Sequence, residues 1–181
     1  MRRIEDEAER MSRLVAELLE LARLDRDGSL QLGSADLADV MREVANDIRA
    51  LHPEREITLE VPEHLECEAD EARIRQILSN LLSNAVEHTP EDTPSTVRLR
   101  AEDGHAVIEV ADEGPGMGEE DQHRAFDRFY RGNRAPGGGS GLGLAIVYAI
   151  AAAHGGEVDI VSTLGEGTTV AVRIPLHRPE K

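Results

Sequence analysis

The sequence predicts an α+β fold, a two-layer sandwich with helices on one face of a sheet. Helical and strand-like segments follow one another along its 181 residues. The stretch STVRLRAEDGHAVIEVADEG alternates apolar and polar residues in both arms around an EDGH turn, which predicts an antiparallel hairpin. Apolar residues make up 40% of the chain and aromatic residues 2%, so we expect one compact domain with an aliphatic core and a helical appendage.

The appendage is the amphipathic helix predicted over residues 1–27. Its apolar residues recur at steps of four and three, with charges on the other face; they are Ile4, Ala8, Met11, Val15, Leu18 and Ala22. Such a seam is typical of a coiled coil or helical bundle, although a helix packed on its own domain has the same period. We expect residues 1–27 to pair with another helix, as a homodimer or with a helix from outside this sequence, and 28–178 to form the domain.

The elements of that domain follow from periodicity and turn residues. The second helix has Ser34 or Asp36 near its start and Pro53 after its end, and the last helix ends at Gly155 and Gly156. The expected order is an extended piece over 30–35, a helix over 36–53, two short strands around a proline turn within 56–70, a buried helix over 71–88, the hairpin over 95–114, an irregular stretch over 113–140 with helix-like residues 119–131, a helix over 141–156 and two strands over 157–176.

The net charge, the number of cysteines and the length of the apolar runs exclude some classes of function. A formal net charge of −16 argues against nucleic acid and against an anionic membrane surface. A local cationic pocket for phosphate remains compatible with it. The single cysteine, Cys67, excludes an internal disulfide and a multi-cysteine metal site. No apolar run is long enough for a membrane span, so we expect a cytoplasmic chain or, if the sequence is a fragment, the cytoplasmic portion of a longer protein.

Two asparagines interrupt the buried helix in the stretch NLLSNAVEHT. Asn80 and Asn84 lie one turn apart and share a helix face, which Glu87 and His88 extend. Asparagine lowers helix propensity and needs polar partners when buried. Its amide oxygen can hold a hard cation such as Mg²⁺. The alternative is an internal hydrogen-bond network.

Glycines surround a carboxylate in VIEVADEGPGMG. A strand ends at Asp112, and Gly114, Gly116 and Gly118 follow in a turn. A strand-end carboxylate can accept a hydrogen bond from an exocyclic amine such as that of adenine, and glycines let a flat ring approach the backbone. An ordinary acidic turn would have the same composition.

A second glycine cluster, PGGGSGLGLAIV, leads into the last helix. Helix N-terminal amides preceded by glycines form a site for anions. No Lys-Ser or Lys-Thr pair follows the glycines, so the cluster is not a P-loop. No apolar strand precedes it, so it is not a dinucleotide-binding turn. A flexible linker is the alternative, but Leu142 and Leu144 alternate with the glycines and continue into the helix.

The irregular stretch between the glycine clusters is longer than most loops, which is typical of a lid or of disorder. Arg128, Arg131 and Arg134 form a local cationic cluster there, with Phe126, Phe129 and Tyr130 among them. Arginines on a closing lid could meet a triphosphate. The alternative is a solvated charged surface whose aromatic residues anchor it to the domain.

These elements together resemble the catalytic, ATP-binding domain of bacterial sensor histidine kinases, in the group that also includes Hsp90, type II topoisomerases and MutL. The matching stretches are NLLSNAVEHT for the N box, DEGPGM and GGSGLGLAIV for the two glycine-rich boxes, FDRFYR for the F box and GEGTTVAVRIPL for the closing strands. The resemblance implies the Bergerat ATP-binding fold, with three helices on a mixed, roughly five-stranded sheet. It also makes residues 1–27 similar to the second helix of the dimerisation and phosphotransfer hairpin.

The resemblance implies a role for each matching residue. Asp112 would bind the adenine amine, Asn84 would ligate Mg²⁺ and Thr168 would lie near the adenine floor. Asn80 and Arg131 would be catalytic, Arg131 by reaching the terminal phosphate from the lid. The nucleotide-binding set is Asn84, Asp112, Gly114, Gly116, Met117, Arg131, Gly139, Gly141, Leu142, Gly143, Leu144 and Thr168.

Three features depart from the family or from its ATP-hydrolysing relatives. Glu87 stands where the family often has a cation facing the phosphates, which should weaken phosphate binding. None of the seven histidines has the context of the family's phosphorylated histidine, so the acceptor would lie on another chain or on a removed segment. Asn80 stands where hydrolysing relatives have a water-activating Glu, so we expect slow ATP hydrolysis.

The partners implied are ATP, Mg²⁺, an acceptor hairpin and a response regulator. Two other functions stay open: an anti-sigma-factor-type serine kinase, and a non-catalytic nucleotide-binding adaptor that acts through residues 1–27.

Overall fold

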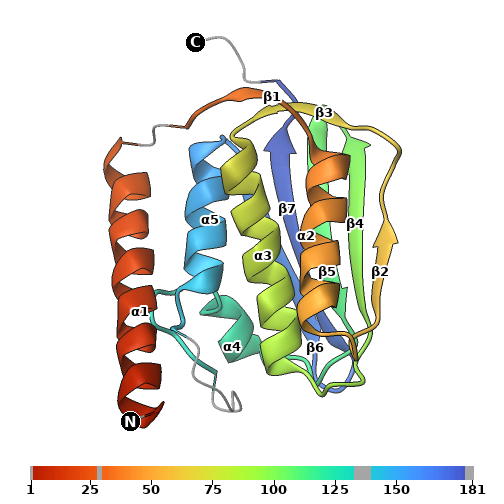
Figure 1. Cartoon of the computed structure of the whole chain (residues 1–181). Helices are drawn as coiled ribbons and strands as arrows, with labels where there is room; N and C mark the ends of the chain where they lie inside the picture. The colour runs from red at the N-terminus through yellow and green to blue at the C-terminus, as the bar shows by residue number, and fades with distance from the viewer. Residues whose placement is uncertain (1, 28–29, 133–139, 178–181) are drawn as a thin grey trace.

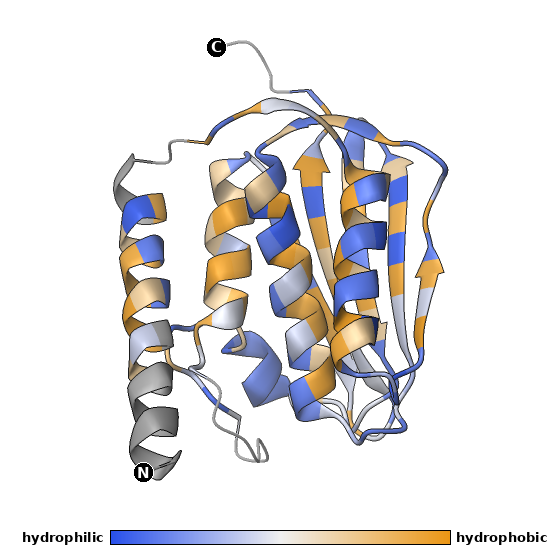
Figure 2. Cartoon of the chain, in the orientation of Figure 1, coloured by the Kyte–Doolittle hydropathy of each residue, from blue (hydrophilic) through white to orange (hydrophobic). Residues whose placement is uncertain are grey.

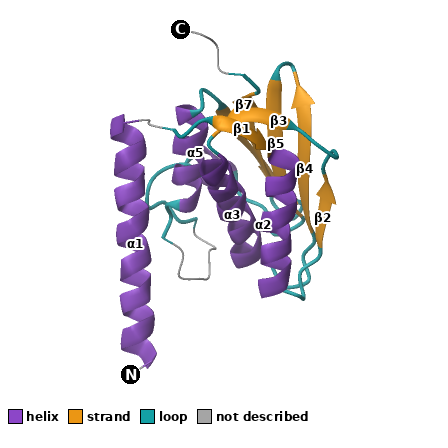
Figure 3. Ribbon diagram, turned by 45° about the horizontal axis from the view of Figure 1, so that its top comes forward, coloured by secondary structure: helices purple, strands orange, loops and turns teal. Residues whose placement is uncertain are grey.

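The computed structural model describes residues 2–27, 30–132 and 140–177. Three helices lie on one face of a five-stranded sheet, and a fourth long helix stands beside them (Figures 1 and 3). The elements are α1 (Arg2–Asp27), β1 (Gly33–Asp36), α2 (Leu37–Leu51), β2 (Ile57–Glu60), β3 (Glu66–Ala69), α3 (Glu71–His88), β4 (Ser95–Glu102), β5 (His105–Asp112), α4 (Glu119–His123), α5 (Gly143–Ala153), β6 (Glu157–Thr163) and β7 (Gly167–Pro175). The predicted α+β sandwich with a mixed sheet is confirmed.

The main sheet has the strand order β2-β4-β5-β7-β6. Only β2 and β4 run parallel, and the predicted hairpin is the antiparallel pair β4–β5, in which Ser95 faces Asp112. The two strands expected around the proline turn both form, but they do not pair with each other. Instead, β3 pairs antiparallel with β1 in a separate two-stranded sheet, because the extended piece after α1 returns alongside it.

Side-chain caps set the starts of α2 and α3. Asp36 Oδ1 accepts a hydrogen bond from the Ala38 amide at 3.0 Å, and Asp70 Oδ1 accepts one from the Arg73 amide at 3.2 Å. The bounds of α3 match the predicted 71–88. The helix-like stretch 119–131 is helical only over α4, whose C-cap residue, Arg124, leaves the helical region with φ of −105° and ψ of 2°. Further along, Phe129 has a positive φ of 64°, which a helix does not allow.

The core lies between the helices and the sheet and is aliphatic, as Figure 2 shows in the orange faces that point inward. Helix α5 is apolar around most of its circumference because α3, the sheet and α1 all pack against it. The largest fully buried side chains are Leu21, Leu37, Met41, Ile74, Ile77, Leu78, Leu82, Ile108, Leu142, Ile146, Ile150 and Ile174.

Helix α1 uses one face to dock on the domain. Leu21 is only 1% exposed, and Leu14 and Leu24 pack against the core beside it. Glu20 forms an ion pair with Arg73 and accepts a hydrogen bond from Gln76 Nε2 at 2.6 Å. A second set of apolar residues on the same helix stays exposed, as described below. No helix among the described residues is long and apolar enough to cross a bilayer.

Candidate functional site

The C-terminal half of α3 directs its two asparagines toward the start of α5. Asn80 Nδ2 donates a hydrogen bond to the Gly143 carbonyl at 3.3 Å. A Cβ atom on Gly143 would lie at an ordinary contact distance of 3.6 Å from Asn84 Oδ1, so the Asn84 amide faces the start of α5. Within the described residues, no hydrogen bond engages the half-buried Asn84 amide. Asn80 therefore joins two helices, whereas Asn84 keeps its oxygen available for a ligand.

Asp112 ends β5 at the same end of the sandwich. Its Oδ1 accepts a hydrogen bond from the Gly114 amide at 2.9 Å, and its backbone faces Thr168 on β7. Burial raises the pKa of Asp112, while the Gly114 and Thr168 amides and the nearby His88 act in the opposite direction. The turn thus holds a half-buried carboxylate in a fixed orientation.

Close packing explains the glycines that follow Asp112. A Cβ on Gly114 would lie 2.5 Å from the Thr89 methyl. Gly116 has a φ of +65°, and a Cβ there would lie 2.0 Å from the Thr163 carbonyl oxygen. The Met117 amide donates to Ser162 Oγ at 2.8 Å. The turn is therefore tied both to the end of α3 and to the turn between β6 and β7.

A small polar cluster supports Thr168, the residue expected at the adenine floor. Ser162 Oγ lies 2.8 Å from Thr168 Oγ1 and donates to the Gly167 carbonyl at 2.8 Å. Gln122 Nε2 donates to the Ser162 carbonyl at 2.8 Å. Residues Ser162 and Gln122 were not expected from the sequence, since a serine in an alternating strand and a glutamine in a charged helix look like surface positions.

The second glycine cluster begins α5. Gly141 has a φ of +69°, and a Cβ there would lie 2.8 Å from the Tyr130 carbonyl oxygen. The Leu142 side chain is fully buried and Leu144 packs on the core, so a nucleotide contact at Leu142 would involve its backbone. Gly139 and Arg134 lie outside the described residues. Arg131 is exposed, shortly before that gap.

Two aromatic residues of the irregular stretch, Phe126 and Tyr130, make specific side-chain contacts. Phe126 packs against Tyr148 of α5, with ring centroids 5.9 Å apart. The Tyr130 hydroxyl donates to Asp121 Oδ1 at 2.6 Å, and the Arg124 guanidinium lies 4.1 Å from the centre of the Tyr130 ring. The contact of Phe126 with α5 fits the alternative in which aromatic residues attach the stretch to the domain, and it leaves the role of the arginines as a prediction.

The predicted site residues from distant parts of the chain therefore meet at one end of the molecule, the lower end in Figure 1. The C-terminal half of α3 links them, since Asn84 faces Gly143 and Thr89 faces Gly114. A shallow hollow beside Tyr148, Gly156 and Asp159 contains none of these residues. Among the described residues, no group of three or more His, Cys, Asp or Glu side chains is placed to hold a metal.

A family model described as histidine kinase-, DNA gyrase B-, and HSP90-like ATPase matches residues 69–178. Among curated proteins, the probable sensor histidine kinase TcrY of Mycobacterium tuberculosis is 39% identical over 180 residues, which cover 97% of this chain and 38% of TcrY. The chain therefore spans well under half the length of this relative.

Solved structures agree with this similarity. Full-length ShkA in complex with AMPPNP matches 97% of this chain and 38% of its own, with a TM-score of 0.83 and 33% identity. Histidine kinase ThkA in complex with response regulator protein TrrA matches 96% of this chain and 49% of its own, with a TM-score of 0.77 and 26% identity. Because the family model also covers more than half of the sequence, the chain belongs to the family of histidine kinase-, DNA gyrase B- and HSP90-like ATPases.

Proposed function

We propose that this chain is the ATP- and Mg²⁺-dependent catalytic part of a sensor histidine kinase in two-component signalling. It presents the γ-phosphoryl group of ATP to a histidine on another chain or segment. The convergence of Asn84, Asp112 and Gly143 around the C-terminal half of α3 carries the proposal. The similarity to the sensor kinase TcrY and to ShkA with AMPPNP supports it.

Asp112 recognises the adenine base in this proposal. Its carboxylate accepts a hydrogen bond from the exocyclic amine, while the Gly114 amide already fixes Oδ1. Asp112 faces Thr168 across the β5–β7 pair, which supports a contact with the base on the floor formed by these two strands. An ionised acceptor makes the stronger hydrogen bond, so adenine binding should weaken when Asp112 is protonated.

The phosphates lie toward the start of α5. Backbone amides at a helix N-terminus favour anions. The available amide oxygen of Asn84 fits Mg²⁺, which prefers oxygen ligands and keeps several waters. When bound, Mg²⁺ would neutralise the charge on the phosphates. Arg131 then approaches the terminal phosphate from the segment before residue 133.

Catalysis by these residues is mainly alignment. The lone pair of an acceptor imidazole forms a bond to the γ-phosphorus as the bond to the β–γ bridging oxygen breaks, and ADP leaves. Asn80 donates to Gly143 and has no basic group to activate water, so hydrolysis of ATP stays slow. Glu87 is exposed in the last turn of α3 and adds a negative charge there.

The exposed face of α1 provides the contact to a second helix. Met11, Val15 and Leu18 are 60%, 54% and 40% exposed and lie at steps of four and three. We infer that residues 1–27 pair through this face, in a homodimer or with an acceptor hairpin, while residues 28–178 form the catalytic domain. A response regulator would receive the phosphoryl group, as the partnership of ThkA and TrrA suggests by analogy. Light scattering on Val15→Asp should show less dimer than on the wild type.

Phosphotransfer to a separate acceptor tests the function. The chain is mixed with γ-labelled ATP, Mg²⁺ and a hairpin fragment that carries the family's phosphorylated histidine. We expect acid-labile, base-stable label on the fragment and its loss in Asp112→Asn. The matched control is Asp159→Asn, because Asp159 is an exposed strand aspartate paired with Arg173 and lies in β6.

Other outcomes identify the two alternatives. Acid-stable, base-labile label on a serine-containing substrate would indicate a serine kinase. Calorimetry in which ATP binds wild type and Asp112→Asn equally weakly, without any label transfer, would favour an adaptor.

A further inference from the structure

A buried arginine lies at the C-terminal end of α3. Arg55, between α2 and β2, is 8% exposed. Its Nη1 donates to Thr89 Oγ1 at 2.7 Å and to the Pro90 carbonyl. Its Nη2 donates to the Val86 carbonyl at 2.5 Å and to the Thr89 carbonyl at 3.0 Å. Every one of these acceptors belongs to residues 86–90, so the guanidinium fixes the end of a single helix.

This arrangement differs from an ordinary ion pair. No carboxylate among the described residues pairs with Arg55, and its Nε is buried without a hydrogen-bond partner. Burying an unpaired charge is unfavourable. The carbonyls that a helix leaves unsatisfied at its C-terminus, together with the negative end of its dipole, offset that penalty. The buried guanidinium charge of Arg55 is thus tolerated at this position, and its hydrogen bonds fix the path of the chain after α3.

Arg55 also fixes the orientation of the Thr89 side chain. Thr89 Oγ1 donates to the Ala85 carbonyl at 2.6 Å and accepts from Arg55, so both functions of the hydroxyl are used. The Thr89 methyl group then points at Gly114, where a Cβ would lie only 2.5 Å from it. Gly114 in turn donates its amide hydrogen to Asp112 Oδ1. A short series of contacts therefore leads from Arg55 to the Asp112 carboxylate.

The neighbouring backbone reinforces the same turn. The Ser95 amide donates to the Glu56 carbonyl at 2.9 Å, and the Glu113 amide donates to the Pro94 carbonyl at 3.3 Å. Ser95 faces Asp112 across the β4–β5 pair. The residue after Arg55 is thus tied to the strand beside Asp112, which gives the segment around Arg55 a second route to the same carboxylate.

We propose that Arg55 is a positioning residue for adenine recognition, acting through Thr89 and Gly114 on the Asp112 carboxylate. This inference rests on the proposed function, in which Asp112 binds the adenine amine. Guanine has a carbonyl where adenine has that amine. A correctly placed carboxylate therefore favours ATP over GTP, and a displaced one loses part of this preference. Arg55 touches no phosphate-binding residue, so its loss should change base selectivity rather than phosphoryl transfer.

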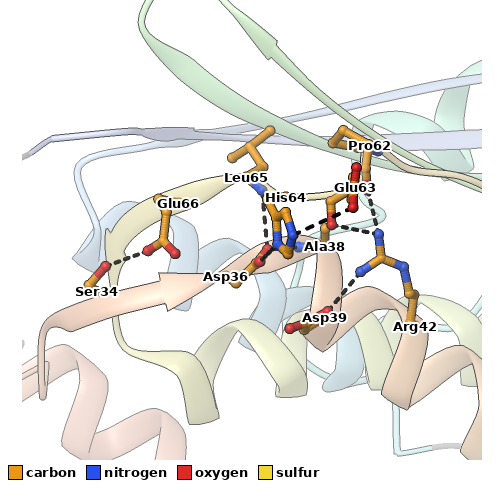
Figure 4. A network of polar contacts seen from close by, with 10 residues as sticks. All are labelled: Ser34, Asp36, Ala38, Asp39, Arg42, Pro62, Glu63, His64, Leu65 and Glu66. Carbon is orange, nitrogen blue, oxygen red and sulfur yellow. Dashed lines mark hydrogen bonds and ion pairs between the residues drawn. The ribbon is translucent and has the colours of Figure 1, made fainter.

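The test compares Arg55→Met with Arg42→Met by calorimetry with Mg²⁺-ATP and Mg²⁺-GTP. Arg42 is a matched control: its Nη2 also donates to two carbonyls, those of Pro62 and Glu63, near Asp36 and His64 (Figure 4). We expect Arg55→Met to reduce the ratio of ATP affinity to GTP affinity about tenfold, the size of one good hydrogen bond. Arg42→Met should keep the wild-type ratio. Phosphotransfer at saturating ATP should change little in either variant.

Three further variants separate positioning from stability. Arg55→Lys keeps the charge and should restore part of the selectivity. Thr89→Ser keeps the hydrogen bond to Arg55 but removes the methyl above Gly114, and Thr89→Val keeps a methyl but loses the hydroxyl. Both should lose selectivity while their thermal midpoints stay above the assay temperature. If Arg55→Met does not fold, the two Thr89 variants therefore decide whether Thr89 and Gly114 position the Asp112 carboxylate.

An unchanged ATP-to-GTP ratio in Arg55→Met, or in both Thr89 variants, would overturn the positioning role while leaving the proposed function intact. Wild-type protein that binds neither nucleotide, or binds both equally, would overturn the proposed function and this inference together.

Discussion

At the scale of single residues, Asp112 shows a conflict between binding and stability. Burial raises its pKa, which means that the folded protein disfavours the ionised form relative to the unfolded chain. The Gly114 and Thr168 amides and His88 oppose this shift without removing it. A carboxylate kept ionised and half-buried at neutral pH is therefore unfavourable for folding, and its retention fits a role in binding.

We expect Asp112→Asn to raise the melting temperature of the nucleotide-free protein by a few degrees at neutral pH. Asparagine can still accept the Gly114 hydrogen bond, but it carries no buried charge. The same substitution should weaken ATP binding at least about tenfold, because it replaces an ionised acceptor by a neutral one. Thermal melting and calorimetry on one sample measure the two effects.

The sign of the pH dependence follows from the direction of the shift. A raised folded-state pKa gives stability that is fully present below the unfolded value of 3.8 and lost as the pH rises through the folded value. The advantage of Asp112→Asn should therefore shrink as the pH is lowered toward 3.8. If the difference in melting temperature between Asp112→Asn and the wild type stays constant down to this pH, the charge of the Asp112 carboxylate is not the cause of that difference.

Asp36 has the opposite shift at the other end of the molecule. The hydrogen bond from His64, at 2.7 Å, lowers its pKa to about 2, and the Leu65 and Ala38 amides act in the same direction (Figure 4). A lowered pKa gives stability that is present above 3.8 and lost as the pH falls to about 2. Asp36 is thus a helix cap and a hydrogen-bond partner of His64 at once.

We expect Asp36→Asn to lower the melting temperature at neutral pH, because asparagine keeps the cap to Ala38 but replaces the ionised acceptor of the His64 hydrogen bond by a neutral one. The shift should be at most about 4 °C, since the His64 side chain is 68% exposed and solvent screens the pair. Melting curves at several pH values should show the difference vanishing as the pH falls from 3.8 to about 2. A difference that widens over that interval would contradict this assignment.

At the scale of elements, α1 has two apolar faces with different roles. Leu21 is buried against the domain, whereas Met11 and Val15 are exposed. The spacing of apolar residues in the sequence could not tell the docked face from the exposed face. A helix docked on its own domain and a helix in a bundle have the same period of apolar residues. The ion pair between Glu20 and Arg73 lies beside Leu21 and fixes the docked face.

We expect Leu21→Ala to weaken the docking of α1 by about 2–5 kcal/mol, the usual range for a buried leucine. Hydrogen exchange should then accelerate in α1 while the strands of the main sheet keep their protection, because undocking is local. Leu19→Ala is the control, since Leu19 is 57% exposed. Equal acceleration in both variants would mean that Leu21 does not hold the helix.

Elements with strong local signals were predictable, and elements set by distant contacts were not. The bounds of α3 and the β4–β5 hairpin follow from periodicity and turn residues. The pairing of β3 with β1 depends on how the chain returns after α1, which no local pattern encodes. The stretch after α4 is also set by a distant contact, because the Phe129 amide donates to the Gly141 carbonyl at 2.9 Å and Phe129 has a positive φ.

The candidate site shows the same division. Asn84, Asp112 and Gly143 stand out in the sequence because asparagine in a buried helix and glycines beside a strand-end acid break the local pattern. Thr89 ends the stretch NLLSNAVEHT, but no pattern assigns it a role, and Arg55 lies in a polar segment that looks like surface. Only the folded structure brings Arg55 to Thr89 and Thr89 to Gly114. Residues that act through contacts on other elements carry no signal of their own.

At the scale of the whole molecule, the proposed function depends on two surfaces, the candidate nucleotide site and the exposed face of α1. The site residues come from α3, β5, β7 and the start of α5, and rigid elements hold them at one end of the sandwich (Figure 1). Helix α1 packs against α5, the same helix that begins at Gly143. A partner on α1 would therefore lie next to the helix that we propose to receive the phosphates.

Amide chemical-shift mapping with AMPPNP and Mg²⁺ tests the central claim most directly. We predict that the amides of Asn84, Gly114, Gly143 and Thr168 shift together with one saturation curve, and that Asp112→Asn removes the shifts. Shifts confined to other surfaces, or separate saturation curves for Gly114 and Gly143, would contradict a single nucleotide site at this end of the molecule.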